Sequence, residues 1–447
     1  MSLLSDRHQW LRLRHRLTRL STLPRTLAAL QKFGRLQWNS RNMLKHRQEQ
    51  KLRQITAYAS TNVPFYRRLL REQHVNPSSI RSLEDLAKLP TITRRDLYRN
   101  FREMSAPGLS GRGELVTSSG SSGPAVSCYI DQITISESIA TSVLFNLWAS
   151  WLPGMTTLQI MRARPENISQ QVYWRLMRTK FLNSLDIRNS TAKSFAKVIA
   201  SSDPSLIISY PSVLGMIARN MDATPPSVRG IIVGSETITP NVARDIEESF
   251  ARRAFNRYGL SEFGGVLMQD CDLHQGLHLN SELAVVEVLD SDGERVAENE
   301  RGRLVITGLR NFVMPLIRYD AGDIGVAGGE CACGRGFPVV SDVVGRTSDV
   351  VRGKNGDEIS SFLLLNALHY YGFFAEFIAE FQFVDKAPGK VGLRIVPTQR
   401  FLDNPTKNGA YIEGRLERTL PILDFEVEIR DELRREESGK QNLVVRN

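Results

Sequence analysis

No run of apolar residues in this 447-residue chain is long enough to span a bilayer, and cysteine is scarce, with four residues. The most apolar helical stretch, 139–152, is broken by polar residues and falls short of the roughly 20 that a membrane helix needs. The basic first residues have no apolar secretory core, which argues against a signal peptide. We therefore expect a cytoplasmic protein whose cysteines stay reduced rather than form disulfides.

Acidic residues are almost absent from residues 1–55, which hold 13 Lys or Arg against Asp6 and Glu49, a net of +11. The whole chain carries +10, so the remainder is close to neutral. Two interpretations of this basic arm stay open. It is either a helix packed on the body by its leucines, or a segment that contacts an anionic membrane surface or polyanionic partner. The basic residues are not interleaved with aromatic ones, so no nucleic-acid groove is predicted.

The length, with ordinary apolar content of 41% and charged content of 24%, predicts a globular chain of two or more domains. Apolar strands alternate with helical segments between residues 131 and 250, which predicts a largely parallel α/β body. The pattern then changes to strands joined by turns up to residue 308. The predicted fold class is α/β, with a large multi-sheet N-terminal domain and a small mobile α+β C-terminal domain. The expected helices are 131–152, 212–221 and 238–250, and the expected buried strands are 206–210 and 230–234.

Small residues form one continuous run between two predicted strands, 114–117 and 126–130. Glycine lets a backbone approach a polyanion closely, and the N–H groups and hydroxyls of such a run can turn toward phosphates. The alternative is a solvated serine-glycine loop. The residues of the run are Ser118, Ser119, Gly120, Ser121, Ser122 and Gly123, followed by Pro124.

Three further clusters carry side chains suited to the rest of a nucleotide. The first follows an apolar strand directly, and α/β proteins bind ligands where strands end. The second combines a flat aromatic face, room for the backbone and a carboxylate suited to Mg²⁺. The third offers a carboxylate that could accept hydrogen bonds from two ribose hydroxyls. In order, the residues are Gly234, Ser235 and Glu236; Tyr258, Gly259, Ser261 and Glu262; and Asp323.

In order and spacing these motifs resemble the adenylate-forming superfamily, which includes acyl-CoA synthetases, adenylation domains of peptide synthetases and luciferases. Within it the chain is most similar to the phenylacetate–CoA ligase branch and its capsular-polysaccharide and coenzyme F390 synthetase relatives. The resemblance begins near Val63-Pro64-Phe65-Tyr66 and runs to the C-terminus. It implies a large ATP- and acyl-binding domain at 56–346 and a small C-terminal lid domain at 347–447, with the basic arm at 1–55 outside it.

The resemblance also implies a role for each cluster in binding ATP and Mg²⁺. The loop 118–125 would hold the phosphates, and the corner 234–236 would border the adenine and the acyl pocket. Tyr258 would lie against the adenine, Glu262 would hold Mg²⁺, and Asp323 would bind the ribose hydroxyls.

Two further residues would take part in the chemistry. Arg346 would contact ribose or phosphate near the hinge between the domains. Lys440, in the segment Ser438-Gly439-Lys440, would stabilise the charge that develops as a carboxylate attacks the α-phosphate, a task suited to a flexible point charge. The alternative for Lys440 is an ordinary surface lysine near a terminus.

Three cysteines fall with histidines in two short clusters. Three thiolates and one imidazole make a closed tetrahedral zinc site, and the same pairing occurs in many phenylacetate–CoA ligase relatives. His278 is preferred to His274 because Gly276 permits the turn that brings it back. The alternative is a set of unlinked, reduced cysteines, as we expect for the buried Cys128. The predicted ligands of a structural Zn²⁺ are Cys271, His278, Cys331 and Cys333, with His274 as the competing imidazole.

The expected activity is ATP-dependent conversion of a carboxylic acid to acyl-AMP, followed by transfer of the acyl group to coenzyme A. The resemblance to this branch favours an aromatic acid. An amine or a carrier-protein thiol as acceptor stays open. A catalytically silent nucleotide-binding scaffold in polysaccharide biosynthesis also stays open, although the retained site residues argue against it. Homodimers occur among the relatives, so a homodimer is one possible assembly, and the sequence leaves the oligomeric state open.

Overall fold

The computed structural model describes residues 22–117, 126–161, 171, 174–187, 189–236, 238, 240–345, 350–354, 358–360, 364, 367–368, 373, 377–431, 433 and 444–446.

One mixed sheet runs through the body, and its eleven strands within the described residues follow the order β10-β11-β12-β13-β9-β8-β7-β6-β5-β3-β4. Strands β3 to β7 pair in parallel, whereas the pairs from β7–β8 onward are antiparallel. The expectation of parallel strands for the region where strands and helices alternate is therefore confirmed, and the later strands, where the sequence pattern changes, are antiparallel. Only four residues join β7 to β8, and so short a turn can connect only antiparallel neighbours. The strands are β3 (Thr157–Met161), β4 (Thr179–Asn183), β5 (Leu206–Ser209), β6 (Gly230–Gly234), β7 (Phe255–Leu260), β8 (Gly265–Asp270), β9 (Leu277–Leu279), β10 (Ala284–Leu289), β11 (Arg301–Gly308), β12 (Tyr319–Ala327) and β13 (Val339–Gly345).

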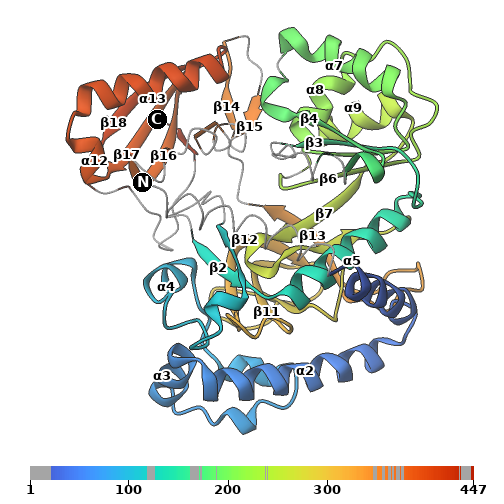
Figure 1. Ribbon diagram of the computed structural model, residues 1–447, viewed down its shortest axis with the longest axis vertical. Coiled ribbons are helices and arrows are strands. Elements are labelled where there is room, and N and C mark those ends of the chain that lie inside the picture. The colour runs from blue at the N-terminus through green and yellow to red at the C-terminus, as the bar shows by residue number, and fades with distance from the viewer. Residues whose placement is uncertain are drawn as a thin grey trace, which may run out of the picture.

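Helices cover this sheet and build the N-terminal part of the molecule. The described chain enters on a helix at 22–36. The later helices are α2 (Arg41–Asn62), α3 (Pro64–Glu72), α4 (Arg94–Arg99), α5 (Gln132–Trp148), α7 (Asn189–Ser202), α8 (Pro211–Ala218) and α9 (Pro240–Phe250). Short 3-10 turns are η1 (Pro77–Ser79), η2 (Glu84–Lys88), η3 (Ser110–Arg112), η4 (Ser184–Asp186) and η5 (Ser261–Phe263). In Figure 1 α2 and α3 lie at the bottom, and α7, α8 and α9 lie together at the top. None of the described helices combines the length and the hydropathy needed to cross a membrane.

Several helices begin where the sequence supplies a suitable first residue. Thr93 caps α4 in a capping box with Asp96, and Asp131 caps α5 by accepting a backbone N–H at 2.7 Å. Pro64 and Pro211 stand at the starts of α3 and α8, where the N–H that proline lacks has no helical partner anyway. The predicted helices at 131–152, 212–221 and 238–250 are confirmed with shifted ends.

The C-terminal part forms a smaller α+β unit. Its four strands within the described residues follow the order β18-β17-β16-β19, and α13 packs on β18. Figure 1 shows this unit beside α7 and α8, and one apolar cluster includes residues of both parts. The predicted α/β class with a smaller α+β C-terminal part is confirmed. The elements are β14 (Val350–Arg352), β15 (Glu358–Ser360), β16 (Ile378–Ala387), β17 (Lys390–Pro397), α12 (Gln399–Leu402), α13 (Pro405–Thr419), β18 (Asp424–Ile429) and β19 (Val444–Arg446).

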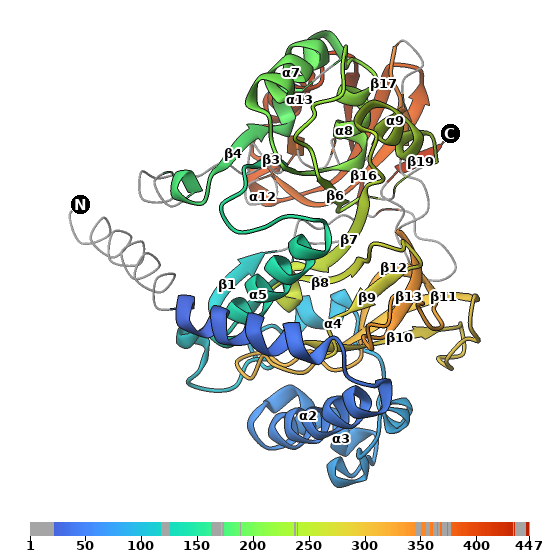
Figure 2. The same cartoon turned by 90° about the vertical axis from the view of Figure 1, so that its right-hand side faces the viewer.

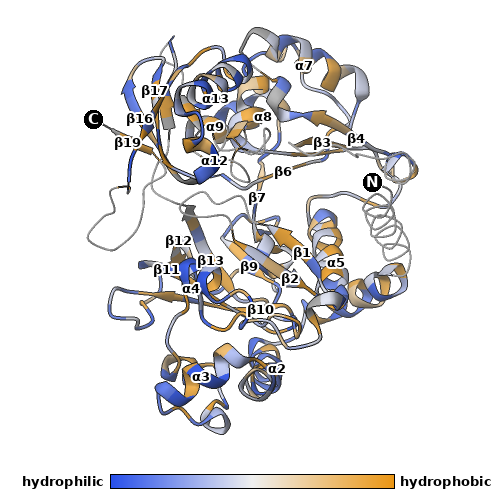
Figure 3. Ribbon diagram, turned by 60° about the vertical axis from the view of Figure 1, so that its left-hand side comes forward, coloured by the Kyte–Doolittle hydropathy of each residue, from blue (hydrophilic) through white to orange (hydrophobic). Residues whose placement is uncertain are grey.

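The described part of the basic arm packs on the body. Phe33 and Leu44 are buried in the main apolar cluster, and Trp148 on α5 donates a hydrogen bond to Gln37 at 2.9 Å. Figure 2 shows the helix 22–36 beside α5, and Figure 3 shows hydrophobic residues along the sheet strands with mixed surfaces on the helices. Residues 22–55 are therefore part of the folded body, and the boundary expected after residue 55 falls inside α2.

Three cations of the arm converge on one buried carboxylate, Glu282. Arg47 Nε lies 2.8 Å and Lys51 Nζ 2.9 Å from it, and Lys32 also contacts it. Burial alone would raise the pKa of Glu282, but these cations outweigh it and hold the pKa below its usual value. Burial also lowers the pKa of Lys51 to about 8. Part of the positive charge of the arm is thus paired with a buried carboxylate rather than exposed on the surface.

Glu282→Gln should lower the free energy of unfolding at pH 7 by about 3–5 kcal/mol, because it leaves partly buried cations uncompensated. Because the folded-state pKa of Glu282 lies below the unfolded value of 4.5, its contribution is present above pH 4.5 and is lost as the pH falls further. Denaturant unfolding between pH 7 and pH 3 should therefore show a shallower loss of stability below pH 4.5 in the variant.

Glu84→Gln is the matched control, since Glu84 pairs with Lys45 at an exposed position where a lost pair costs about 0–1 kcal/mol. Equal effects of the two substitutions at pH 7 would contradict the assigned role of Glu282.

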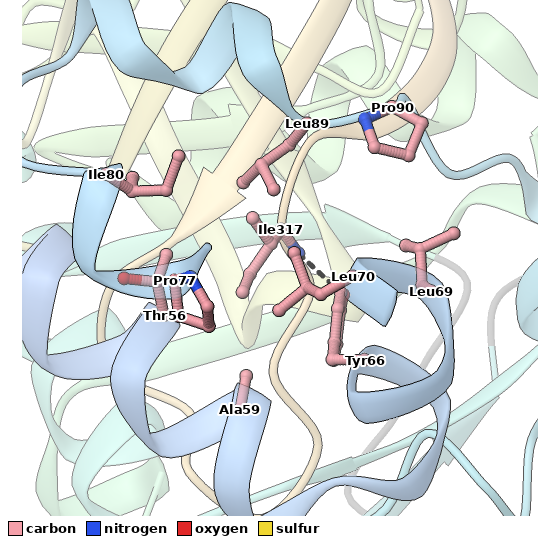
Figure 4. Close-up of a pocket in the computed structure, with 10 residues that line it drawn as sticks. All are labelled: Thr56, Ala59, Tyr66, Leu69, Leu70, Pro77, Ile80, Leu89, Pro90 and Ile317. Carbon is pink, nitrogen blue, oxygen red and sulfur yellow. Dashed lines mark hydrogen bonds between the residues drawn. The ribbon is translucent and has the colours of Figure 1, made fainter. Parts of the chain in front are cut away.

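The N-terminal helices also fix the segment that enters β12. The Tyr66 hydroxyl accepts the N–H of Ile317 at 2.9 Å and donates to the carbonyl of Pro315 at 3.1 Å. Figure 4 shows Tyr66 and Ile317 at a small apolar cavity, together with Leu70 and Leu89. The cavity volume is only about 10 Å³, so it is a packing defect rather than a ligand site.

Candidate functional site

The first predicted cluster forms a corner at the end of β6. Gly234 pairs with Arg257 of β7, and a Cβ at Gly234 would lie 2.3 Å from the Arg257 carbonyl oxygen, so only glycine fits. Ser235 follows with φ of 69°, in the left-handed region. Glu236 Oε2 accepts the N–H of Ser212 at 3.0 Å, which ties the corner to the start of α8.

Tyr258 and Asp323 come together from distant parts of the chain. The Tyr258 hydroxyl donates a hydrogen bond of 2.7 Å to Asp323 Oδ2, across a sequence separation of 65. Tyr258 lies on β7 and Asp323 on β12. Both side chains are only partly buried, so a ligand can reach an aromatic face and a carboxylate that adjoin. The two side chains predicted to contact the base and the ribose are therefore neighbours in the structure.

Gly259 allows the close approach of β7 and β8, the hairpin that carries the predicted residues Ser261 and Glu262. A Cβ at Gly259 would lie 2.3 Å from the carbonyl oxygen of Gly265, so the strands on either side of η5 can approach only with glycine here. The turn η5, which includes Ser261 and Glu262, packs against β1 (Glu114–Thr117) and β2 (Ser127–Ile130). These two strands pair antiparallel and flank the predicted phosphate loop.

Glu262 is a buried carboxylate at this point, 4% exposed. The Tyr319 hydroxyl donates to its Oε1 at 3.4 Å, and Arg94 Nη1 lies 3.7 Å from the same atom. Hard oxygen ligands are what Mg²⁺ prefers, and it is commonly held by one or two carboxylates together with substrate phosphates. The carboxylate, placed beside the strands of the phosphate loop, fits that task.

A groove with a cavity volume of about 620 Å³ lies under α9, on the face of the sheet that also carries Tyr258. Asn256, two residues before Tyr258 and therefore on the same face of β7, lines it together with Asp270 and His274. Asp270 Oδ2 lies 2.7 Å from His274 Nδ1, and burial raises the pKa of Asp270 to about 6. The volume is in the range of small-molecule sites. The sequence analysis missed Asn256 and Asp270, although strand alternation from Tyr258 would have found the first.

Four predicted metal ligands gather at one place. The Sγ atoms of Cys271 and Cys331 are 3.6 Å apart, and Cys333 Sγ lies 3.5 Å from His278 Nε2. One potential ligand atom from each of the four residues lies within 4.8 Å of the others. Tetrahedral zinc with bonds of about 2.3 Å to sulfur and 2.0–2.1 Å to nitrogen requires separations of about 3.5–3.8 Å. The donor set and its spacing therefore fit zinc.

The surroundings orient these ligands. His278 is fully buried, and its Nδ1 lies 3.3 Å from the Phe337 carbonyl, which leaves Nε2 toward the thiols. Burial lowers the pKa of His278 to about 4, so the imidazole is neutral. The backbone N–H of Arg335 donates to Cys333 Sγ at 3.5 Å. His274, the competing imidazole, pairs with Asp270 instead and is not part of the cluster.

Three sets of predicted residues lie outside the described residues: the loop Ser118 to Gly123, Arg346 and Lys440. Of the rest, the structure brings together Tyr258 with Asp323, and the three cysteines with His278. Arg94, which contacts Glu262, was not singled out by the sequence, since the motif Thr93-Arg94-Arg95-Asp96 indicated only a capped helix.

The chain is similar to known proteins over most of its length. The AMP-binding enzyme family matches residues 182–315. Phenylacetate-coenzyme A ligase of Thermus thermophilus is 29% identical over 341 residues, which cover 70% of this chain and 73% of that protein. Protein CapK of Staphylococcus aureus is 23% identical, with 72% of each chain covered. A crystal structure of 2-hydroxyisobutyryl-CoA ligase in the postadenylation state shares the fold, with a TM-score of 0.61 at 18% identity, over 93% of this chain and 92% of that one.

The mixed sheet and the smaller C-terminal part, together with these matches, support an enzyme of the adenylate-forming superfamily. Within that superfamily, the matches support the phenylacetate–CoA ligase-like branch of AMP-forming ligases.

Proposed function

We propose that this enzyme uses ATP and Mg²⁺ to activate a carboxylic acid as an acyl-adenylate and then transfers the acyl group to the thiol of coenzyme A. The hydrogen bond between Tyr258 and Asp323 carries this proposal, since it joins a base platform to a ribose acceptor. Several relatives are named phenylacetate-coenzyme A ligase, which supports coenzyme A as acceptor and an aromatic acid as substrate.

Two displacements make up the reaction. A carboxylate oxygen attacks the α-phosphorus of ATP, the bond from that phosphorus to the oxygen bridging to the β-phosphate breaks, and pyrophosphate leaves. The thiolate of coenzyme A then attacks the acyl carbonyl carbon, and AMP leaves with the oxygen that joined it to the acyl group. AMP is a good leaving group, so activation makes the second step possible.

The residues of the chain act mainly by positioning and by neutralising charge. Tyr258 offers a face for the adenine, and Asp323 accepts from the ribose. Glu262 would hold Mg²⁺, which supplies positive charge to the phosphates. The loop 118–125 would bind the phosphates through backbone N–H groups and hydroxyls, and Lys440 would stabilise the charge that develops at the α-phosphate.

We further propose that residues 347–447 act as a lid that rotates about the segment 346–349 between the two displacements. Rotation would withdraw Lys440 after adenylation and admit the thiol. The separate four-stranded C-terminal sheet supports this, since a unit with its own strands can move as a body.

We also propose that Cys271, His278, Cys331 and Cys333 hold a structural Zn²⁺. All four ligand positions are taken by protein atoms, as in closed structural sites, and catalytic zinc sites keep a position open. The distances among the four ligand atoms support this assignment.

Product analysis tests the proposed reaction. The protein is incubated with Mg·ATP and a panel of aromatic and aliphatic carboxylic acids, with and without coenzyme A, and products are identified by mass spectrometry. We expect an acyl-adenylate without coenzyme A and an acyl-CoA with it. If the adenylate is consumed only by an amine or a carrier-protein thiol, then that group, and not coenzyme A, is the acceptor. No adenylate with any acid would overturn the proposal.

A further inference from the structure

Hydrogen bonds of Leu89 and Ile92 join the segment before α4 to the start of strand β12. Ile92 pairs with Tyr319 in parallel, through a bond of 2.8 Å from its N–H to the Arg318 carbonyl and another of 2.8 Å from the Asp320 N–H to its own carbonyl. The buried Arg318 guanidinium also donates to the carbonyl of Leu89 at 2.5 Å. The residue that follows the cap of α4 is therefore held at a defined place beside the strand that carries Asp323.

That residue is Arg94, and its side chain reaches the site. Its guanidinium lies 3.7 Å from Glu262 Oε1, and only 16% of the side chain is exposed. Burial raises the pKa of the Cys128 thiol, the charge of Glu262 adds to this, and the charge of Arg94 opposes it. Both charges are therefore close to Cys128, which lies on β2, directly after the predicted phosphate loop.

The charge at this place changes when a nucleotide binds. Without a nucleotide, the positive charge of Arg94 and the negative charge of Glu262 offset each other. If Glu262 holds Mg²⁺, as the proposed function requires, the metal neutralises the carboxylate charge. The Arg94 guanidinium is then available to bind the phosphates of the Mg·ATP complex. A guanidinium recognises phosphate oxygens through two parallel N–H bonds.

We propose that Arg94 binds the β- and γ-phosphates of ATP, and therefore the pyrophosphate product, while Glu262 is engaged with Mg²⁺. This inference rests on the proposed function. It assigns recognition of the polyphosphate tail to the first residue of α4, in addition to the loop 118–125. AMP lacks these phosphates, so Arg94 should distinguish ATP from AMP.

Calorimetry on the full chain in the presence of Mg²⁺, without a carboxylic acid, tests this role. ATP, pyrophosphate and AMP are titrated into the wild type, Arg94→Ala, Arg94→Lys and Arg95→Ala. Arg95 is the adjacent, exposed arginine and serves as the matched control. Arg94→Ala should weaken the binding of ATP and pyrophosphate by at least about tenfold and change AMP affinity by less than about twofold. Arg94→Lys keeps the charge and should recover part of the loss, and Arg95→Ala should change nothing.

A merely structural ion pair between Arg94 and Glu262 predicts a different pattern. Loss of ATP and AMP binding by the same factor would overturn the proposal, as would unchanged ATP binding in Arg94→Ala. If Arg94→Ala does not fold, Arg94→Lys decides the question by the same comparison of ATP with AMP. Failure of the wild type to bind ATP would instead contradict the proposed function itself.

Discussion

Lys440→Ala is expected to reduce the acid-dependent exchange of pyrophosphate into ATP by at least about 10²–10³-fold, the scale of removing one group that stabilises transition-state charge. The same variant should form the thioester from supplied acyl-adenylate at a rate within about threefold of the wild type, because Lys440 acts only where charge develops at the α-phosphate. Exchange kinetics and single-turnover transfer to coenzyme A measure the two halves separately. Lys440 lies outside the described residues, so this prediction rests on the segment Ser438-Gly439-Lys440 and the resemblance.

Lys390→Ala is the matched control, because Lys390 is an exposed lysine at the start of β17 in the same C-terminal part. It should leave both half-reactions unchanged. Equal loss of both half-reactions in Lys440→Ala would contradict its assigned role and indicate that the substitution disturbs the fold of the C-terminal part.

Cys271→Ser is expected to remove the bound metal and to lower the stability by several kcal/mol. Structural zinc in small domains contributes apparent binding free energies of about 10–16 kcal/mol, and this energy stabilises the folded state. Cys271 is fully buried, and its Sγ lies 3.6 Å from that of Cys331, so the serine oxygen would replace a thiolate at the centre of the cluster. Elemental analysis of the purified protein and its thermal unfolding measure the two effects.

Cys128→Ser provides the control for this prediction. Cys128 is buried on β2, away from the cluster, so its substitution should leave one zinc per chain. A wild-type protein that contains no zinc after purification without chelators would refute the metal site. Retention of one equivalent by Cys271→Ser would do the same for the ligand set.

The contacts within the site depend on pairings between distant strands, which the local sequence does not reveal. The strand before Gly234 and the helix after it follow from an apolar run and a capped, periodic segment, and both were predicted. The bond between Tyr258 and Asp323 required β7 and β12 to lie in one sheet with four strands between them in the chain, which local patterns do not encode. The family resemblance, rather than the spacing, brought these residues to one nucleotide in advance.

Two further features could not be predicted for different physical reasons. The antiparallel half of the sheet begins at the hairpin closed by Gly259, and a glycine in a strand did not by itself indicate a reversal. The charge of the basic arm is set by tertiary contacts, since Lys32, Arg47 and Lys51 meet Glu282, which lies more than 200 residues away in the chain. A count of charges could not distinguish these buried partners from a surface patch.

Exchange of labelled pyrophosphate into ATP by the wild-type protein, over a panel of carboxylic acids with Mg²⁺, tests the central claim most directly. Exchange requires a reversible adenylate and does not depend on the acceptor. The account predicts exchange that appears only when an acid is added and that disappears when Mg²⁺ is chelated. No exchange with any acid, from a folded protein that contains its metal, would contradict it.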